Sequence, residues 1–132
     1  MTFKKTRTHP VPALRAVVEE YDDSTFGARH IHLRTDDQEM AFLVAFPTIP
    51  ETSDGRAHIL EHLSLCGSVR FPVRDPFFSM TRRSLGWMNA LTMPDKTVYP
   101  FATTDRTDFF NLLDVYLDAA FFPTLEIGRA HV

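Results

Sequence analysis

The pattern of apolar and polar positions in the first third of the chain predicts three β-strands. Residues 14–21 and 28–34 alternate in part between apolar and polar side chains, and the turn-forming residues 22–24 separate them. The run at 40–46 is almost wholly apolar and has the length of a buried strand. Because the connections between these strands are short, we expect an antiparallel meander.

The next part of the chain predicts two helices separated by a loop. Thr52, Ser53 and Asp54 offer N-cap chemistry to a helix over residues 55–63. A proline-containing loop follows, and then a second short helix is expected over residues 77–85. We therefore expect a helix–loop–helix segment after the three strands.

The last part of the chain predicts two strands and a longer helix. The strands are expected at 87–92 and 97–103, joined by a turn at 93–96. Apolar residues recur at a spacing of 3.6 over residues 105–122, which predicts a helix that Pro123 ends. This order of elements indicates the α+β class, with helices packed on an antiparallel or mixed sheet.

The composition is that of an ordinary globular domain: 132 residues, 44% hydrophobic and 23% charged. A net charge of −3 argues against a nucleic-acid partner, and the single Cys66 cannot form an internal disulfide. No apolar run approaches the roughly 18 residues that a membrane span needs, so no membrane partner is expected. Three adjacent phenylalanine pairs are expected in the core: Phe77, Phe78, Phe109, Phe110, Phe121 and Phe122.

One motif in the first predicted helix carries chemistry: His58-Ile59-Leu60-Glu61-His62, or H-x-x-E-H. At 100° per residue, the two imidazoles and the carboxylate fall within about 100° of helix arc. Two histidines one turn apart can bind the same Zn²⁺, and a carboxylate between them can take a proton from a water that the ion activates. The alternative is that these are solvated or paired side chains on a helix surface.

The residues around the motif resemble the pitrilysin/insulysin-type zinc metallopeptidases, and more closely their presequence-protease branch. The resemblance covers nearly all of residues 14–125. It is carried by the run G-R-A-H-I-L-E-H-L-S-L-C-G-S-V-R-F-P-V-R-D-P at 55–76 and by M-N-A-L-T at 88–92, Y-P-F-A at 99–102 and D-V-Y-L-D-A at 114–119.

The resemblance implies a role for five residues. His58 and His62 would be ligands of a Zn²⁺ cofactor, and Glu61 would be the general base and acid. Asn89 and Ala90 match the family's edge-strand segment, which pairs with the backbone of a bound peptide. In the family, a Glu from a later helix completes the zinc site. Here Glu126 is the only Glu after His62, so the third ligand is expected to be missing.

The resemblance also implies a division of the chain. Residues 1–13 are expected to be a short solvated lead-in and residues 14–125 a partial N-terminal metallopeptidase domain. The resemblance ends there, and the remaining E-I-G-R-A-H-V (126–132) can be encoded by a sequencing-adapter oligonucleotide. We therefore expect a non-native tail that truncates a longer protein, whose missing C-terminal domains would be partners of this segment.

The expected function is that of an N-terminal fragment of a zinc-dependent endopeptidase, with short unstructured oligopeptides as substrates. The fragment itself is expected to be inactive because a zinc ligand is missing. The alternative is a non-catalytic structural or peptide-binding subunit of the same fold. Because little sequence precedes the resemblance, a bacterial cytoplasmic location is expected rather than an organellar matrix.

Overall fold

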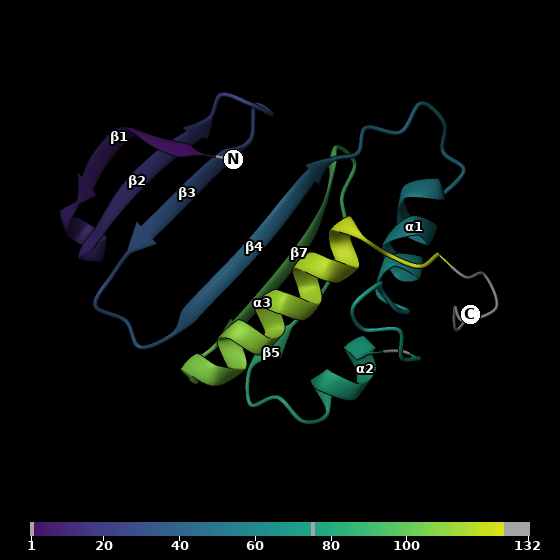
Figure 1. Cartoon of the computed structure of the whole chain (residues 1–132). Coiled ribbons are helices and arrows are strands. Elements are labelled where there is room, and N and C mark those ends of the chain that lie inside the picture. Colours follow the sequence, from purple (N-terminus) through teal and green to yellow (C-terminus); the bar gives the residue numbers. More distant parts are fainter. Residues whose placement is uncertain (1, 75, 126–132) are drawn as a thin grey trace. The chain divides into compact units, whose positions relative to one another are not determined.

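The computed structural model describes residues 2–74 and 76–125, which divide into two compact units after Gln38. The suspected non-native tail, 126–132, lies outside the described residues. Within these described residues, each unit holds one β-sheet, and the three α-helices belong to the second unit (Figure 1). Among the described residues no helix is long and apolar enough to cross a membrane.

The first unit is a three-stranded antiparallel sheet in the order β1-β2-β3. Its strands are β1 (Phe3–Val11), β2 (Ala16–Asp23) and β3 (Arg29–Arg34), and a 3₁₀ turn over Pro12–Leu14 joins the first two. The solvated lead-in expected over residues 1–13 is therefore mostly a paired strand. Because the β1 side chains are almost all exposed, apolar alternation could not reveal it.

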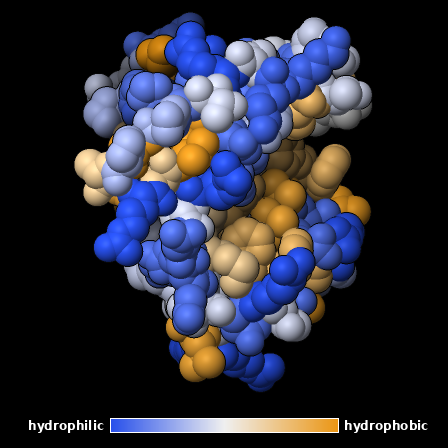
Figure 2. All heavy atoms as spheres, turned by 90° about the vertical axis from the view of Figure 1, so that its left-hand side faces the viewer, coloured by the Kyte–Doolittle hydropathy of each residue, from blue (hydrophilic) through white to orange (hydrophobic). Residues whose placement is uncertain are grey.

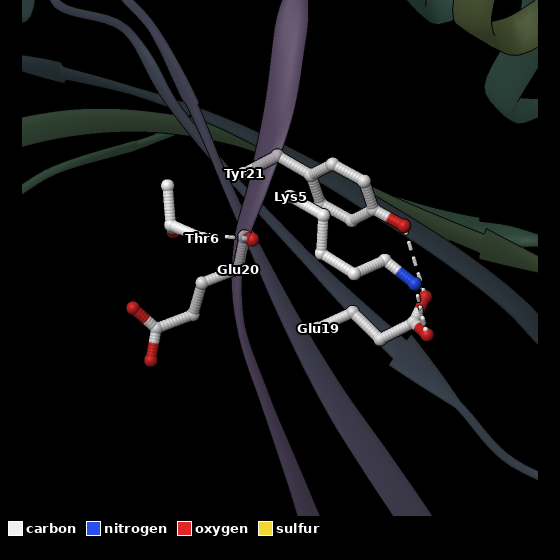
Figure 3. Close-up of polar contacts among 5 residues, drawn as sticks. All are labelled: Lys5, Thr6, Glu19, Glu20 and Tyr21. Carbon is white, nitrogen blue, oxygen red and sulfur yellow. Dashed lines mark hydrogen bonds and ion pairs between the residues drawn. The ribbon is translucent and has the colours of Figure 1, made fainter.

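Polar contacts between strands hold β1 against β2 (Figure 3). Lys5 Nζ of β1 lies 2.7 Å from Glu19 Oε1 of β2, and within β2 the Tyr21 Oη donates to Glu19 Oε2 over 3.0 Å. On the neighbouring position, Thr6 Oγ1 donates to the Glu20 carbonyl over 3.3 Å. The hydrogen bonds from Lys5 and Tyr21 keep the pKa of Glu19 below its ordinary value. Cross-strand side-chain pairs therefore stabilise an edge strand that buries little apolar surface.

Asp23 closes the turn after β2 and is buried. Its carboxylate accepts hydrogen bonds from the backbone N–H groups of Phe26 (3.0 Å) and Thr2 (3.3 Å). Burial alone would raise the pKa of Asp23, but these hydrogen bonds together with those from Thr25 hold the pKa below its ordinary value of 3.8. The ionised carboxylate is therefore the form that stabilises this turn.

We expect Asp23→Ala to destabilise the chain at neutral pH and to matter progressively less in acid. A carboxylate with a lowered folded-state pKa contributes stability above its ordinary value of 3.8, and that contribution is lost as pH falls through the folded-state pKa. Urea midpoints of both proteins, measured from pH 7 to pH 2, should converge toward the acid end. A constant difference across this range would contradict the prediction.

The second unit contains a sheet in which β7 (Lys96–Thr103) lies between β4 (Met40–Pro47) on one side and the short strands β5 (Trp87–Met88) and β6 (Leu91–Thr92) on the other. All pairings are antiparallel. The expected meander is therefore wrong for its third strand, because β4 pairs with β7 and belongs to a different sheet from β3. The short loop between β3 and β4 favours pairing of these two strands, but β4 pairs instead with β7, which comes much later in the sequence.

Three helices complete this unit: α1 (Arg56–Ser64), α2 (Pro76–Thr81) and α3 (Arg106–Phe121). The predicted C-terminal helix is confirmed, and Asp105 caps it by accepting a hydrogen bond from the Asp108 N–H over 2.8 Å. The N-cap position of α1 is Gly55 in a left-handed conformation (φ 75°), so none of the three expected residues occupies it. Asp54 nevertheless supplies part of the expected capping, because its Oδ1 accepts a hydrogen bond of 3.3 Å from the Arg56 N–H at the start of the helix. The second helix is also shorter than predicted.

The core of the second unit lies between α3 and one face of the sheet. It is formed by Met88, Tyr99, Phe101, Leu112 and Tyr116. Tyr99 and Phe101 point to the same face of β7; Phe101 contacts Tyr116 of α3, and the Tyr99 hydroxyl meets Ser64 of α1. Both helices therefore cover the same face.

The expectation that all six paired phenylalanines lie in the core is wrong for four of them. Phe77 and Phe109 pack against the core. The other four phenylalanines are exposed. Adjacent helix positions differ by 100°, so both members of a pair rarely face the same core. Figure 2 likewise shows apolar residues at the surface among hydrophilic ones. The exposed phenylalanines are Phe78, Phe110, Phe121 and Phe122.

Strands β5 and β6 share one register against β7, which places the intervening Asn89 opposite Pro100. The Asn89 N–H donates to the Pro100 carbonyl over 3.0 Å. The reciprocal bond cannot form because proline has no N–H. Instead, the buried Tyr116 hydroxyl donates to the Asn89 carbonyl over 3.3 Å. The tyrosine thus supplies the donor that the central strand lacks.

We expect Tyr116→Phe to cost about 1–3 kcal/mol because it leaves the Asn89 carbonyl without this donor. Pro100→Ala restores a backbone N–H at the position opposite Asn89, so it should reduce that cost. The two effects should therefore be non-additive in a double-mutant cycle measured by urea unfolding. Additive free energies would show that residue 100 and Tyr116 do not serve the same carbonyl.

Candidate metal centre on helix α1

The two histidines of the motif come together on the exposed side of α1. His58 and His62 are both exposed, and their Nε2 atoms lie 3.0 Å apart. Their ring centroids are 4.7 Å apart, with 44° between the ring planes. The helical spacing of four residues brings about this convergence. A hydrogen bond between a donor and an acceptor tautomer is one interpretation of this contact, and a shared metal ion is the other.

The separation of the two nitrogens fits zinc. Tetrahedral Zn²⁺ binds imidazole nitrogens at about 2.0–2.1 Å, which places two such ligands roughly 3.3 Å apart. The observed Nε2–Nε2 distance of 3.0 Å is close to that value. No large movement of either ring is therefore needed for both to bind one ion.

Glu61 lies on the same helix turn and, unlike the two histidines, is buried, with 6% of its surface exposed. Its Oε2 accepts a hydrogen bond of 2.6 Å from the Thr92 hydroxyl on β6. Such a short distance is typical of a hydroxyl donating to an ionised carboxylate. The sheet therefore fixes one oxygen of the carboxylate.

A second set of hydrogen bonds fastens the end of α1 to β7. Ser64 Oγ donates to the Glu61 carbonyl over 2.8 Å and lies 2.9 Å from the Tyr99 hydroxyl. Burial is the main cause that raises the pKa of Tyr99, so its hydroxyl stays protonated. The single hydrogen of the Ser64 hydroxyl is donated to the Glu61 carbonyl, so the Tyr99 hydroxyl is the donor in its bond with Ser64 Oγ. Ser64 and Tyr99 thereby connect the helix turn that carries Glu61 to strand β7.

Asn89 and Ala90 lie on the strand segment between β5 and β6. The Asn89 backbone faces β7, and both its N–H and its carbonyl are bonded within the chain. By strand alternation the Ala90 backbone faces the opposite edge. Its N–H meets the Asn89 Oδ1 at 2.9 Å. Of the two, Ala90 is thus the residue whose backbone is directed toward the open edge.

The acidic residues of α3 all have other partners. Asp114 forms a two-pronged ion pair with Arg70, and Asp118 accepts a hydrogen bond of 2.8 Å from the Arg70 N–H. Asp108 accepts from Ser84 Oγ, and Asp105 is the helix cap. Within residues 2–74 and 76–125, no three His, Cys, Asp or Glu side chains form a cluster that could hold a metal ion.

The sequence reasoning identified the motif but missed the residues that support it, namely Thr92, Ser64 and Tyr99. Their positions depend on which strands lie under α1. A hydroxyl residue on a strand is common, so nothing in the local pattern singled these out. The register of β6 against β7 pairs Thr92 with Thr97, but it does not indicate that Thr92 contacts Glu61.

The motif H-x-x-E-H is the inverted form of the H-E-x-x-H motif of zinc peptidases. A helix that carries it over an antiparallel sheet is typical of that class of peptidases. The family model described as "Insulinase (Peptidase family M16)" matches residues 48–129. The chain belongs to this peptidase family. The family predicted by resemblance is thereby confirmed.

Curated relatives agree with this assignment. The chain is 50% identical over 124 residues to "Presequence protease, mitochondrial" of Eremothecium gossypii, 49% identical over 125 residues to that of Saccharomyces cerevisiae, and 51% identical over 125 residues to that of Danio rerio. These matches cover 93–94% of this chain but only 12–13% of the relatives. The chain thus spans about an eighth of their length.

The fold is also shared with a solved structure. The crystal structure of pitrilysin is similar with a TM-score of 0.73 at 22% identity, over 94% of this chain and 14% of that one. The predicted α+β class is confirmed by this likeness.

The expected bacterial cytoplasmic location is wrong, because the matched relatives are mitochondrial proteins of eukaryotes. The expectation came from the little sequence that precedes the resemblance. Localisation signals are separate from the packed domain, so the length of the sequence before the resemblance does not indicate where a protein resides.

Proposed function

We propose that this chain is part of a zinc-dependent endopeptidase that hydrolyses short unstructured peptides, and that its full-length form acts on presequence peptides in mitochondria. The observation that carries the proposal is the 3.0 Å approach of the His58 and His62 Nε2 atoms with the buried Glu61 between them in sequence. The names of the relatives support the substrate and the compartment.

In this proposal His58 and His62 hold the ion, and a third ligand comes from outside the described residues. Bound Zn²⁺ supplies Lewis-acid polarisation of water and of the scissile carbonyl. Glu61 accepts one proton from the attacking water as its oxygen bonds to the carbonyl carbon. Glu61 then gives that proton to the leaving nitrogen as the C–N bond breaks, so one water is divided between the new carboxyl and the new amine.

The substrate backbone would lie along the strand that carries Asn89 and Ala90. Because the Asn89 backbone is bonded inward, we assign the pairing with substrate to the outward-facing Ala90. The Asn89 side chain meets the Ala90 N–H, so a bound peptide would displace it. Strand addition of this kind favours extended, unstructured peptides over folded proteins.

Removing the metal should abolish hydrolysis by the full-length protein, and adding Zn²⁺ should restore it. A presequence-like peptide is incubated with protein, protein plus chelator, and chelated protein dialysed into Zn²⁺. The His58→Ala variant should not recover at the same Zn²⁺ concentration because it lacks one ligand. The 132-residue chain is expected to be inactive in every case.

Two results would contradict the proposal. Undiminished hydrolysis by fully metal-free protein would exclude the zinc mechanism. Binding of the peptide by zinc-loaded full-length protein without any cleavage would instead favour a non-catalytic peptide-binding subunit.

A further inference from the structure

Thr92 makes the shortest polar contact of the candidate site, yet the proposed reaction assigns it no role. Its hydroxyl donates to Glu61 Oε2 over 2.6 Å from a half-buried position on β6. The residue opposite on β7 is Thr97, whose hydroxyl is paired with Thr48 at 2.8 Å. Two facing threonines thus make bonds of similar length, but only one of them touches the carboxylate.

The Thr92 bond differentiates the two oxygens of the Glu61 carboxylate. The terminal torsion of a glutamate is broad and roughly two-fold, so the two oxygens exchange places easily when neither is held. A donor on Oε2 fixes the plane of the group and leaves Oε1 as the oxygen without this partner. A base held in one orientation loses less entropy when the proton transfer occurs.

Burial makes this restraint effective. Only 6% of the Glu61 surface is exposed, so water cannot easily replace the threonine as a donor. The Ser64–Tyr99 contact fixes the backbone of the same turn, whereas Thr92 fixes the carboxylate itself. The backbone and the side chain of Glu61 are therefore held by different strands, β7 and β6.

We propose that Thr92 is a positioning residue, which orients the Glu61 carboxylate so that Oε1 exchanges the proton with water and with the leaving nitrogen. The inference rests on the proposed function. The contact that carries it is the hydrogen bond between the Thr92 hydroxyl and Glu61 Oε2, and it predicts that the hydroxyl of residue 92, rather than its bulk, determines the effect.

The test compares Thr92→Val, Thr92→Ser and Thr97→Val in the full-length protein. Thr92→Val keeps the shape and removes the donor, so we expect kcat to fall about tenfold to a hundredfold with KM unchanged. Thr92→Ser should recover most of kcat. Thr97→Val removes a hydroxyl contact of similar length (2.8 Å against 2.6 Å) on the paired residue and should leave kcat within about twofold. If Thr92→Val misfolds, Thr92→Ala is measured in its place and should show the same loss of kcat.

A readout independent of activity follows the carboxylate directly. The antisymmetric carboxylate stretch of Glu61, assigned in infrared difference spectra against Glu61→Gln, should shift in Thr92→Val and stay in place in Thr92→Ser. Both spectra are recorded on metal-free protein. The visible spectrum of the cobalt-substituted protein should be the same in all Thr92 variants, because the histidines are untouched.

The outcomes separate the two proposals. If the full-length protein cleaves peptide in a Glu61-dependent way but Thr92→Val loses no more kcat than Thr97→Val, the positioning role is overturned and the proposed function stands. An unshifted carboxylate band in Thr92→Val overturns it as well. If the full-length protein shows no Glu61-dependent cleavage, both proposals fall.

Discussion

Replacing Glu61 with glutamine in the full-length protein is expected to lower kcat by about a hundredfold to ten-thousandfold while leaving bound zinc unchanged. Glutamine has nearly the same shape, and its amide oxygen can still accept the 2.6 Å hydrogen bond from Thr92. It cannot take a proton from water at neutral pH. The loss should therefore fall on the chemical step and not on folding or peptide binding.

The control for this prediction is Asp54→Asn, which makes the same carboxylate-to-amide change just before α1. Asp54 pairs with Arg56 at the surface and is far less buried than Glu61. Its replacement should leave kcat unchanged, since surface ion pairs contribute little and the asparagine oxygen can still accept the hydrogen bond from the Arg56 N–H. Activity is measured at saturating peptide, and zinc by atomic absorption. A Glu61→Gln protein with nearly wild-type kcat would rule out Glu61 as the proton carrier.

Adding a single methyl group at Gly86 should destabilise the second unit by about 1–3 kcal/mol. A Cβ at this position would lie 2.4 Å from the Ala102 carbonyl oxygen and 2.8 Å from Thr103 Cβ. Both belong to the central strand β7, so neither can swing aside as a flexible side chain would. Gly86 is not among the glycines with positive φ, so the cost comes from the close approach.

The neighbouring Leu85 provides the control for this second prediction. It is 94% exposed, so Leu85→Ala should change the free energy of unfolding by less than about 0.5 kcal/mol. Trp87 is the only tryptophan of the chain and adjoins Gly86, so its fluorescence reports unfolding at this place. Equal urea midpoints for Gly86→Ala and the parent chain would show that β5 can move away from β7 without cost.

The elements that could be predicted are those in which the spacing of apolar residues along one segment matches the face that the segment buries. The helix α3 carries an apolar stripe and a capping Asp105, and both are readable locally. The H-x-x-E-H spacing likewise determines that His58 and His62 converge, because four residues make about one helical turn. Local geometry was therefore sufficient for the predicted ligand pair.

The elements that could not be predicted depend on contacts distant in sequence. Strand β1 is held by pairs such as Lys5–Glu19 and shows no apolar alternation. The pairing of β4 with β7 joins residues 49 to 63 positions apart, such as Pro47 with Lys96 and Met40 with Thr103. Thr92 became part of the site only because that sheet lies under α1. Its role follows from tertiary structure alone.

The division of α1 into an exposed pair of histidines and a buried glutamate has a consequence for how such a protein can diverge. Under the proposed function, substituting His58 or His62 would remove metal affinity but disturb little packing, because both side chains are exposed, so variants could lose catalysis and still fold. Substituting Glu61 with a residue that cannot accept a hydrogen bond would leave the half-buried Thr92 hydroxyl without this acceptor, so it would cost stability as well. Catalytically silent descendants of this fold should therefore lose their histidines more readily than their glutamate.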